Sequence, residues 1–165
     1  MSDSISIMKD GLIIQTATPE ALYETPASRY VADFIGESNL FSGTVRRLDS
    51  GRVVLGTPAG LELSSPPTPT GPALAPQAEG CIAVRPELVG ITAADTELPR
   101  EVRLKGRVED RIYLGNLTEY RVRTDAFGIV CVRVPRQAGG TDQGFEHGAP
   151  VQVGWNQASG LAMAL

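Results

Sequence analysis

The chain has few of the side chains on which most enzymatic sites depend. Its 165 residues include one histidine, two cysteines and one tryptophan, and only 5% of them are aromatic. His147 lies in a polar loop without partners at the spacing of a metal site or a catalytic triad, so neither is expected. Cys81 and Cys131 lie in apolar runs of the sequence, which predicts buried thiols rather than a disulfide.

Membrane and secretion signals are missing as well. No apolar run approaches the roughly 20 residues that a membrane-spanning helix needs, and the N-terminus lacks the apolar region of a signal peptide. We therefore expect a cytoplasmic protein. The formal net charge of −4 argues against a nucleic-acid-binding surface over the whole chain, so no nucleic-acid partner is expected.

Motifs for phosphate chemistry are also absent. The nearest approach to a P-loop runs from Gly51 to Thr57, and it has Thr57 where the loop requires lysine. No pair of nucleophile and base can be assigned elsewhere. The chain is therefore predicted not to be an enzyme, with no catalytic, cofactor-binding or metal-binding residue.

Turn-forming residues, by contrast, are abundant. Eighteen glycines and twelve prolines divide the chain into short elements. Asp10-Gly11 predicts a hairpin between residues 5–7 and 12–14. Thr18-Pro19 and Thr25-Pro26 each have the N-cap and first-turn pattern of a helix, which predicts helices over 19–24 and about 26–35.

Beyond residue 39 the pattern is that of strands. A Pro-rich loop is expected at 64–80. Eight or more short strands without long helices predict an all-β barrel. The expected strands are 40–48, 52–55, 61–63, 81–84, 88–92, 102–112, 120–123, 129–134, 151–155 and 161–165.

Apolar and basic residues alternate over 102–112, and Gly106 in this row is a candidate for a bend or bulge. The alternation predicts that one set of apolar side chains points into the barrel and faces a second set, namely Val102, Leu104, Val108 and Ile112 against Val130, Val132 and Val134. The basic residues leave two interpretations open. They form either a solvated strand face balanced by interleaved acids, or an anion site whose candidate contacts are Arg85, Arg103, Arg107, Arg121 and Arg123.

The N-terminal stretch "MKDGLIIQTATPEALYETPASRYVADFIGESNLFSGTV" resembles a junction in ABC-import ATPase subunits. There the nucleotide-binding domain ends and a C-terminal regulatory domain begins. The matching pieces are Asp10-Gly11 with Gln15, Pro19-Glu20 with Tyr23 and Pro26, and the run from Val31 to Gly36 that ends at Asn39. The "FIGESN" form is similar to importers of polyamines, opines and phosphonates.

The remainder is similar to the TOBE domain, a transport-associated OB-type barrel. Val84-Arg85-Pro86-Glu87, Tyr113-Leu114-Gly115 and Gly148 to Trp155 match its motifs. The resemblance implies an all-β, OB-type (TOBE) barrel with a short N-terminal hairpin and a two-helix segment. It also implies a division at residue 38, with 1–38 from the tail of the nucleotide-binding domain and 39–165 as the TOBE domain.

The resemblance further implies a regulatory and dimerisation domain of an importer's ATP-binding subunit, for polyamines or a related small solute. ATP and Mg²⁺ would belong to the full-length parent, which would lie on the cytoplasmic face of the inner membrane against permease subunits. The chain itself is expected to be a C-terminal part without the ATPase motifs. Two alternatives stay open: a small-oxyanion-binding domain of molybdate type, and an OB-type oligonucleotide-binding module.

The second expected helix carries an apolar row that cannot stay in water without cost. A homodimer is therefore expected, and the candidate dimer and connector contacts are Tyr30, Val31, Phe34 and Ile35.

Overall fold

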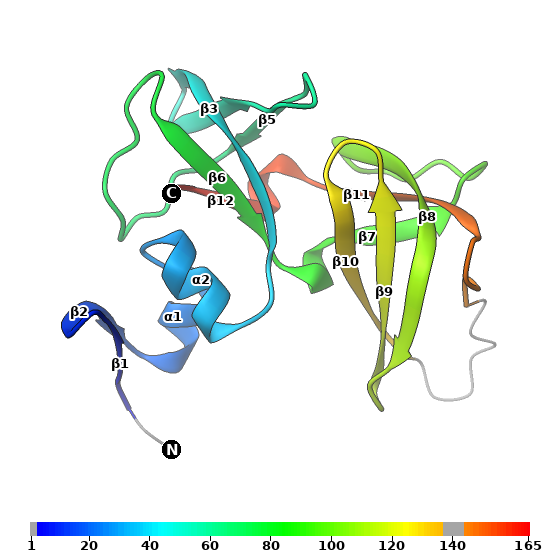
Figure 1. The fold of residues 1–165 in the computed structure, drawn as a ribbon, viewed down its shortest axis with the longest axis horizontal. Coiled ribbons are helices and arrows are strands. Elements are labelled where there is room, and N and C mark those ends of the chain that lie inside the picture. Colours follow the sequence, from blue (N-terminus) through cyan, green and yellow to red (C-terminus); the bar gives the residue numbers. More distant parts are fainter. Residues whose placement is uncertain (1–2, 137–143) are drawn as a thin grey trace. The chain divides into compact units, whose positions relative to one another are not determined.

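The computed structural model describes residues 3–136 and 144–165, which divide into two compact units. The first unit contains the described residues up to 83 together with 160–165, and the second contains those of 84–159. Strands dominate both, as Figure 1 shows, so the expected all-β class is confirmed. None of the helices in the described parts of the chain is long and apolar enough to cross a membrane.

The first unit begins with the expected hairpin and two helices. β1 (Ile5–Lys9) and β2 (Leu12–Ala17) pair antiparallel, and the turn residues Asp10 and Gly11 both have positive φ. α1 (Pro19–Glu24) has the predicted bounds, because the Thr18 hydroxyl accepts a hydrogen bond from the Ala21 amide at 3.2 Å.

The second helix starts later than predicted. α2 (Arg29–Ile35) has Ser28 as its N-cap, so Thr25-Pro26 is not its start. The backbone before α2 is held from outside the helix. The Gln15 side chain donates to the carbonyl of Thr25 at 3.1 Å and accepts from the amide of Ala27 at 2.8 Å. These bonds hold the backbone after Thr25 in a non-helical conformation, and the helix begins only after Ser28.

A five-stranded sheet makes up the rest of the first unit. Its strands are β3 (Asn39–Asp49), β4 (Arg52–Gly56), β5 (Glu62–Ser65), β6 (Glu79–Val84) and β12 (Gly160–Ala164). Their order is β12-β6-β3-β4-β5. Ala32 of α2 packs with Cys81 and Met163, so the helix shares a core with the sheet. The Pro-rich segment after β5 is irregular, as predicted.

The second unit has its own five-stranded sheet. A 3-10 turn, η1 (Pro86–Leu88), leads into it, and another, η2 (Gln157–Ser159), ends it. The order is β10-β9-β8-β11-β7. The strands are β7 (Gly90–Ala93), β8 (Val102–Tyr113), β9 (Leu117–Thr124), β10 (Gly128–Pro135) and β11 (Pro150–Trp155).

The strands are divided between two five-stranded sheets that have the same topology. β3, β4, β5 and β6 occupy the positions that β8, β9, β10 and β11 occupy in the other sheet. The fifth strand is β12 in the first sheet and β7 in the second. Each of these two follows, across a 3-10 turn, a strand of the other sheet. From β3 onward the chain therefore consists of two successive repeats that exchange their last strand.

The predicted inward row of β8 is correct only in its first part. Leu104 and Val108 are buried and Val102 is half-buried, but Ile112 is 36% exposed. The pairing of β8 with β9 shifts between Val108 and Asp110, so the bulge lies at Glu109 and not at Gly106. A bulge adds one residue and moves all later side chains to the other face, which explains the exposure of Ile112.

The facing row agrees with the prediction. Val130 and Val132 are fully buried in β10, and Val134 is half-buried.

The two cysteines are free, as expected, but only Cys81 is buried, since Cys131 lies half-buried in β10. The expected boundary at residue 38 concerns the parent's domains and stays a prediction.

Candidate functional site

The hairpin and helices of the first unit expose several large apolar side chains. Six of the large apolar side chains that are more than a third exposed come from β1, β2, α1 and α2. Exposure reaches 69% at Leu12, 64% at Phe34 and 62% at Ile13. We call these six residues the N-terminal apolar surface: Met8, Leu12, Ile13, Ile14, Tyr23 and Phe34.

Ring contacts connect β1 to α2 within this region. The Tyr30 and Phe34 rings stack with centroids 6.1 Å apart, and the Tyr30 hydroxyl donates to the carbonyl of Met8 at 3.3 Å. The Lys9 ammonium lies 5.0 Å from the centroid of the Tyr30 ring. These contacts fix α2 against the hairpin. The exposed apolar side chains of both elements are therefore held in defined positions.

The four α2 residues predicted as dimer and connector contacts differ in burial because of this packing. Val31 is fully buried in a cluster with Ile7 and Leu22, and Tyr30 and Ile35 pack half-buried against that cluster. Phe34 is the one member of the row that lies mostly in solvent. A dimer contact through these residues stays a prediction, and Phe34 is the side chain best placed to make it.

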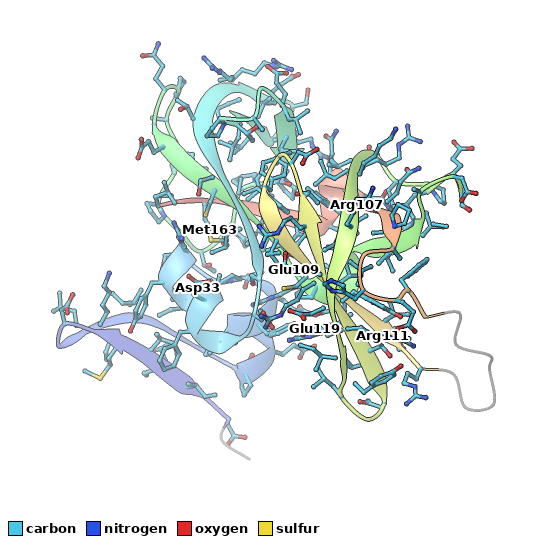
Figure 2. All side chains as sticks on the ribbon, turned by 45° about the vertical axis from the view of Figure 1, so that its right-hand side comes forward. Asp33, Arg107, Glu109, Arg111, Glu119 and Met163 are labelled. Atoms are coloured by element: carbon cyan, nitrogen blue, oxygen red, sulfur yellow. The ribbon has the colours of Figure 1, made fainter. Side chains whose placement is uncertain are left out.

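The face of α2 opposite Phe34 carries Ala32, which packs with Cys81 and Met163 in the core of the first unit. Figure 2 labels Asp33 on this helix and Met163 on β12. Burial raises the pKa of the Cys81 thiol to about 11, the charge of Arg29 opposes this shift, and the charge of Asp33 adds to it. A thiol of such high pKa is a poor nucleophile at neutral pH, so Cys81 is a core residue.

The basic residues proposed as anion contacts do not converge on one site. Arg103 lies 3.7 Å from Glu97, and Arg121 lies 3.6 Å from Glu119. Arg85 stands half-buried at the start of η1. The remaining two candidates, Arg107 and Arg123, lie directly opposite each other on β8 and β9.

Arg107 and Arg123 line an open pocket of about 360 Å³ on the second sheet. Figure 2 labels Arg107 on β8. We call this cavity the basic pocket; its lining is completed by Ala94, Lys105, Gly106, Asp125, Pro150 and Val151. Lys105 was not among the predicted contacts, although its place two residues before Arg107 on one strand face could have identified it.

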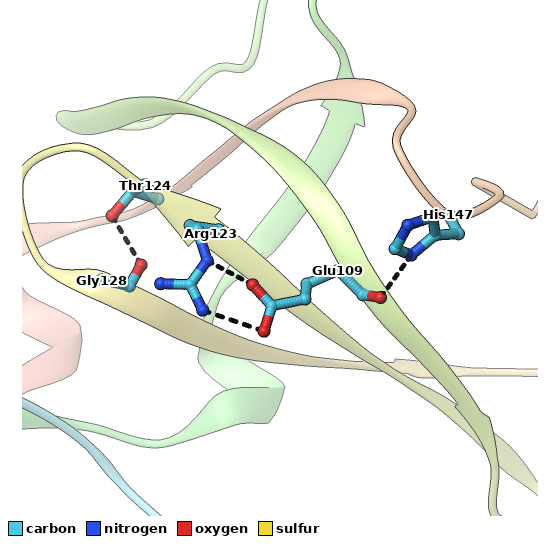
Figure 3. Close-up of polar contacts among 5 residues, drawn as sticks. All are labelled: Glu109, Arg123, Thr124, Gly128 and His147. Atoms are coloured by element: carbon cyan, nitrogen blue, oxygen red, sulfur yellow. Dashed lines mark hydrogen bonds and ion pairs between the residues drawn. The ribbon is translucent and has the colours of Figure 1, made fainter.

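Arg123 is also half of a bidentate ion pair, drawn in Figure 3. Its Nε donates to one oxygen of Glu109, and its Nη2 donates to the other at 2.9 Å. These hydrogen bonds, more than the desolvation that opposes them, lower the pKa of Glu109. The Glu109 carbonyl lies 2.7 Å from Nδ1 of His147, so the sole histidine contacts backbone and not a ligand cluster.

A buried carboxylate on β9 was missed by sequence reasoning. Glu119 is 3% exposed, and its oxygen accepts a hydrogen bond from Nε of Arg133 at 2.9 Å. Figure 2 shows Glu119 on its strand. Sequence alone contains no signal for it, because alternation predicts an outward acid and only the pairing with β10 places Arg133 opposite it. The pair satisfies both charges within the sheet.

The Tyr113-Leu114-Gly115 corner projects from the second sheet. Tyr113 is 56% exposed, and the guanidinium of Arg111 lies 4.7 Å from its ring centroid. Arg111 in turn forms an ion pair with Glu146 at 2.7 Å. The corner is thus held by charge and ring contacts, and Gly115 has the positive φ that its turn requires.

Three comparisons relate this chain to known proteins. The family model of the TOBE domain matches residues 82–163. A spermidine/putrescine import ATP-binding protein of Rubrobacter xylanophilus is 35% identical over 157 residues, which cover 94% of this chain and 39% of that protein. One from Chromobacterium violaceum is 32% identical over 97% of this chain and 44% of its own length. One from Frankia alni is 42% identical over 75% of this chain.

The chain therefore spans less than half the length of these relatives. Among solved structures, the cytoplasmic molybdate-binding protein ModG in a molybdate-bound form has a TM-score of 0.61 and covers 77% of this chain and 96% of its own. Its sequence identity is 18%, so the likeness concerns the fold.

Proposed function

The chain belongs to the TOBE-domain family, and from this we propose that it is the regulatory and dimerisation part of the ATP-binding subunit of an ABC importer. The solute class proposed for that importer is polyamines or a related small solute, because the relatives are spermidine/putrescine import proteins. In the parent, the neighbouring partners would be membrane permease subunits on the cytoplasmic face. The chain contributes contacts and not chemistry.

The N-terminal apolar surface is the observation that carries the contact role. Its members Leu12, Ile13 and Phe34 are each more than 60% exposed. Burying a large apolar side chain is worth about 1.5–3 kcal/mol, so each of these exposed groups is a candidate for a contact with a partner. A partner that covered these three groups would therefore gain several kcal/mol before the cost of association.

A second copy of the chain is the partner we propose for this surface. A two-fold pair buries the same patch on both copies, so one apolar surface is enough to form the contact. Residues 1–38 also hold six acidic and two basic side chains, which would face their equivalents across such a pair. Salt screens this repulsion but leaves apolar burial intact, so the association should strengthen as salt is added.

Sedimentation velocity with point variants tests this contact. Removal of the whole N-terminal segment would be uninformative, because Ala32 belongs to the core of the first sheet. We instead compare Leu12→Asp and Phe34→Asp with Leu48→Asp, a change at a 51% exposed residue on β3. The first two should shift the chain towards monomer and the third should not. A chain that is monomeric at all concentrations would contradict the dimer.

We propose no nucleotide chemistry for this chain. ATP and Mg²⁺ would be held by the rest of the parent, since the chain has neither a P-loop lysine nor a recognisable acidic partner for Mg²⁺ beside one. Calorimetric titration with ATP and Mg²⁺ should give no saturable binding isotherm. Saturable binding would contradict the assignment.

A thermal-shift panel separates this function from the alternatives. Spermidine represents polyamine binding, molybdate and sulfate represent oxyanion binding, and single-stranded DNA represents oligonucleotide binding. A large shift with DNA would favour an oligonucleotide module, and one with molybdate but not with sulfate would favour a molybdate carrier. A shift confined to spermidine would support a regulatory role in polyamine import.

A further inference from the structure

Both sheets carry a pocket at the same place in their topology. In the first unit a pocket of about 390 Å³ is lined by residues from β3, the end of β4 and the start of β6. In the second unit the basic pocket is lined by residues from β8, the end of β9 and the start of β11. β3, β4 and β6 correspond to β8, β9 and β11, so the two pockets are equivalent.

Local geometry fixes this equivalence residue by residue. A Cβ added to Gly43 or to Gly106 would meet a carbonyl oxygen of the neighbouring strand at 2.6 Å in each case. The register of each long strand then shifts just after the valine that lies two residues further on, Val45 or Val108. Gly43 therefore corresponds to Gly106, because the close approach and the bulge recur at the same spacing.

The strand that follows shows the same correspondence. Thr57 and Thr124 each donate a hydroxyl hydrogen bond of 3.0 Å to the carbonyl four residues ahead. Together these matches pair Ser42 with Lys105, Thr44 with Arg107 and Gly56 with Arg123.

The cations of the basic pocket are therefore not required by the fold. The first sheet forms the same strands with Ser42, Thr44 and Gly56 at these positions. In the second sheet Arg107 and Arg123 are directly opposed across the strands, and like charges in that arrangement are destabilising. The fold does not require this unfavourable pairing of two arginines, and a bound anion would offset their repulsion.

Contacts within the chain neutralise only part of this charge. Glu109 pairs with Arg123, and Arg107 donates to the carbonyl of Gly148 at 3.1 Å. Asp125 also lines the pocket. No ion pair of Lys105 or Arg107 occurs among the described residues, so no carboxylate there offsets either side chain.

We propose that the basic pocket binds a small anion that carries at least two negative charges on phosphate or carboxylate oxygens, with Lys105 and Arg107 as its main contacts. A volume of about 360 Å³ suits a small molecule, being near the lower limit of ligand pockets. Guanidinium and ammonium donors match oxyanions in both charge and hydrogen bonding. The proposal does not depend on the importer assignment.

Isothermal titration of the full chain with inorganic phosphate and, separately, with citrate tests this site at constant ionic strength set by chloride. The decisive variant is Lys105→Ser with Arg107→Thr, which installs the side chains that the first sheet already carries at these positions. Loss of charged hydrogen bonds should weaken binding roughly tenfold or more. The matched control is Ser42→Ala with Thr44→Ala in the first pocket, which should bind like the parent.

Emission of the buried Trp155, which lies on β11 of the same sheet, checks that the second unit of each variant is folded. Saturable binding of either anion that the double variant loses supports the site, and the anion that binds identifies the group recognised. The proposal is overturned if neither anion binds above the chloride background. It is equally overturned if the folded double variant binds like the parent, or if the control variant loses as much.

Discussion

Val132 offers the sharpest test of how the second sheet is built. It is fully buried in the middle of β10, opposite the buried Tyr120 on β9. Val132→Asp would lose about 1.5–3 kcal/mol of apolar burial. An unpaired carboxylate in this place would cost several kcal/mol more. The sum is comparable with the roughly 5–15 kcal/mol that keeps an ordinary domain folded.

Urea unfolding followed by Trp155 emission measures this effect, because Trp155 is the sole tryptophan and lies 1% exposed in the same sheet. Ile129→Asp is the control, since Ile129 is on the same strand but 37% exposed, and it should change stability by about 0.5 kcal/mol or less. Burial raises the pKa of the carboxyl that Val132→Asp introduces, so the gap to the parent should narrow as pH falls. Equal urea midpoints for Val132→Asp and the parent at pH 7 would refute the inward assignment.

Three further outcomes are expected. Gly106→Ala should destabilise the chain by about 1–3 kcal/mol in urea unfolding, since its Cβ would meet the Arg123 carbonyl oxygen at 2.6 Å. Cys81, with its pKa raised to about 11, should resist iodoacetamide at pH 8 until the chain unfolds, as mass spectrometry of the alkylated peptide can show. Arg123 lowers the pKa of Glu109 from 4.5, so their contribution is present above that pH and is lost as pH falls through the folded-state pKa. Glu109→Gln should therefore be less stable than the parent at pH 7 and lose less stability during acid titration below about pH 4.5.

Local signals in the sequence predicted the N-terminal elements well. Asp10-Gly11 placed the hairpin turn, and Thr18-Pro19 placed the start of α1. These signals act within a few residues, so neighbouring sequence contains them in full. The start of α2 was missed because Thr25-Pro26 has the same pattern as a cap, while the bonds from Gln15 that override it come from a distant strand.

Pairing between strands that are distant in the sequence accounts for most of the remaining differences between the predictions and the structure. The bulge at Glu109 depends on how β8 meets β9, and alternation along one strand cannot contain it. The burial of Glu119 depends likewise on Arg133 in the next strand. The two-sheet arrangement rests on which strands β7 and β12 join, and no local residue pattern specifies that choice. For the same reason the arginines are scattered along the sequence, and only the register gathers Lys105, Arg107 and Arg123 around one pocket.

Hydrogen–deuterium exchange at several chain concentrations tests the central claim, that the N-terminal apolar surface is a protein contact, most directly. The reporting peptides cover β1, β2 and α2, and peptides from the exposed Tyr113-Leu114 corner serve as an internal reference. We expect protection of the hairpin and helix amides to rise with concentration while the corner stays unchanged. Leu12→Asp should abolish that rise. Exchange independent of concentration in the hairpin, or protection that develops only elsewhere, would contradict the account.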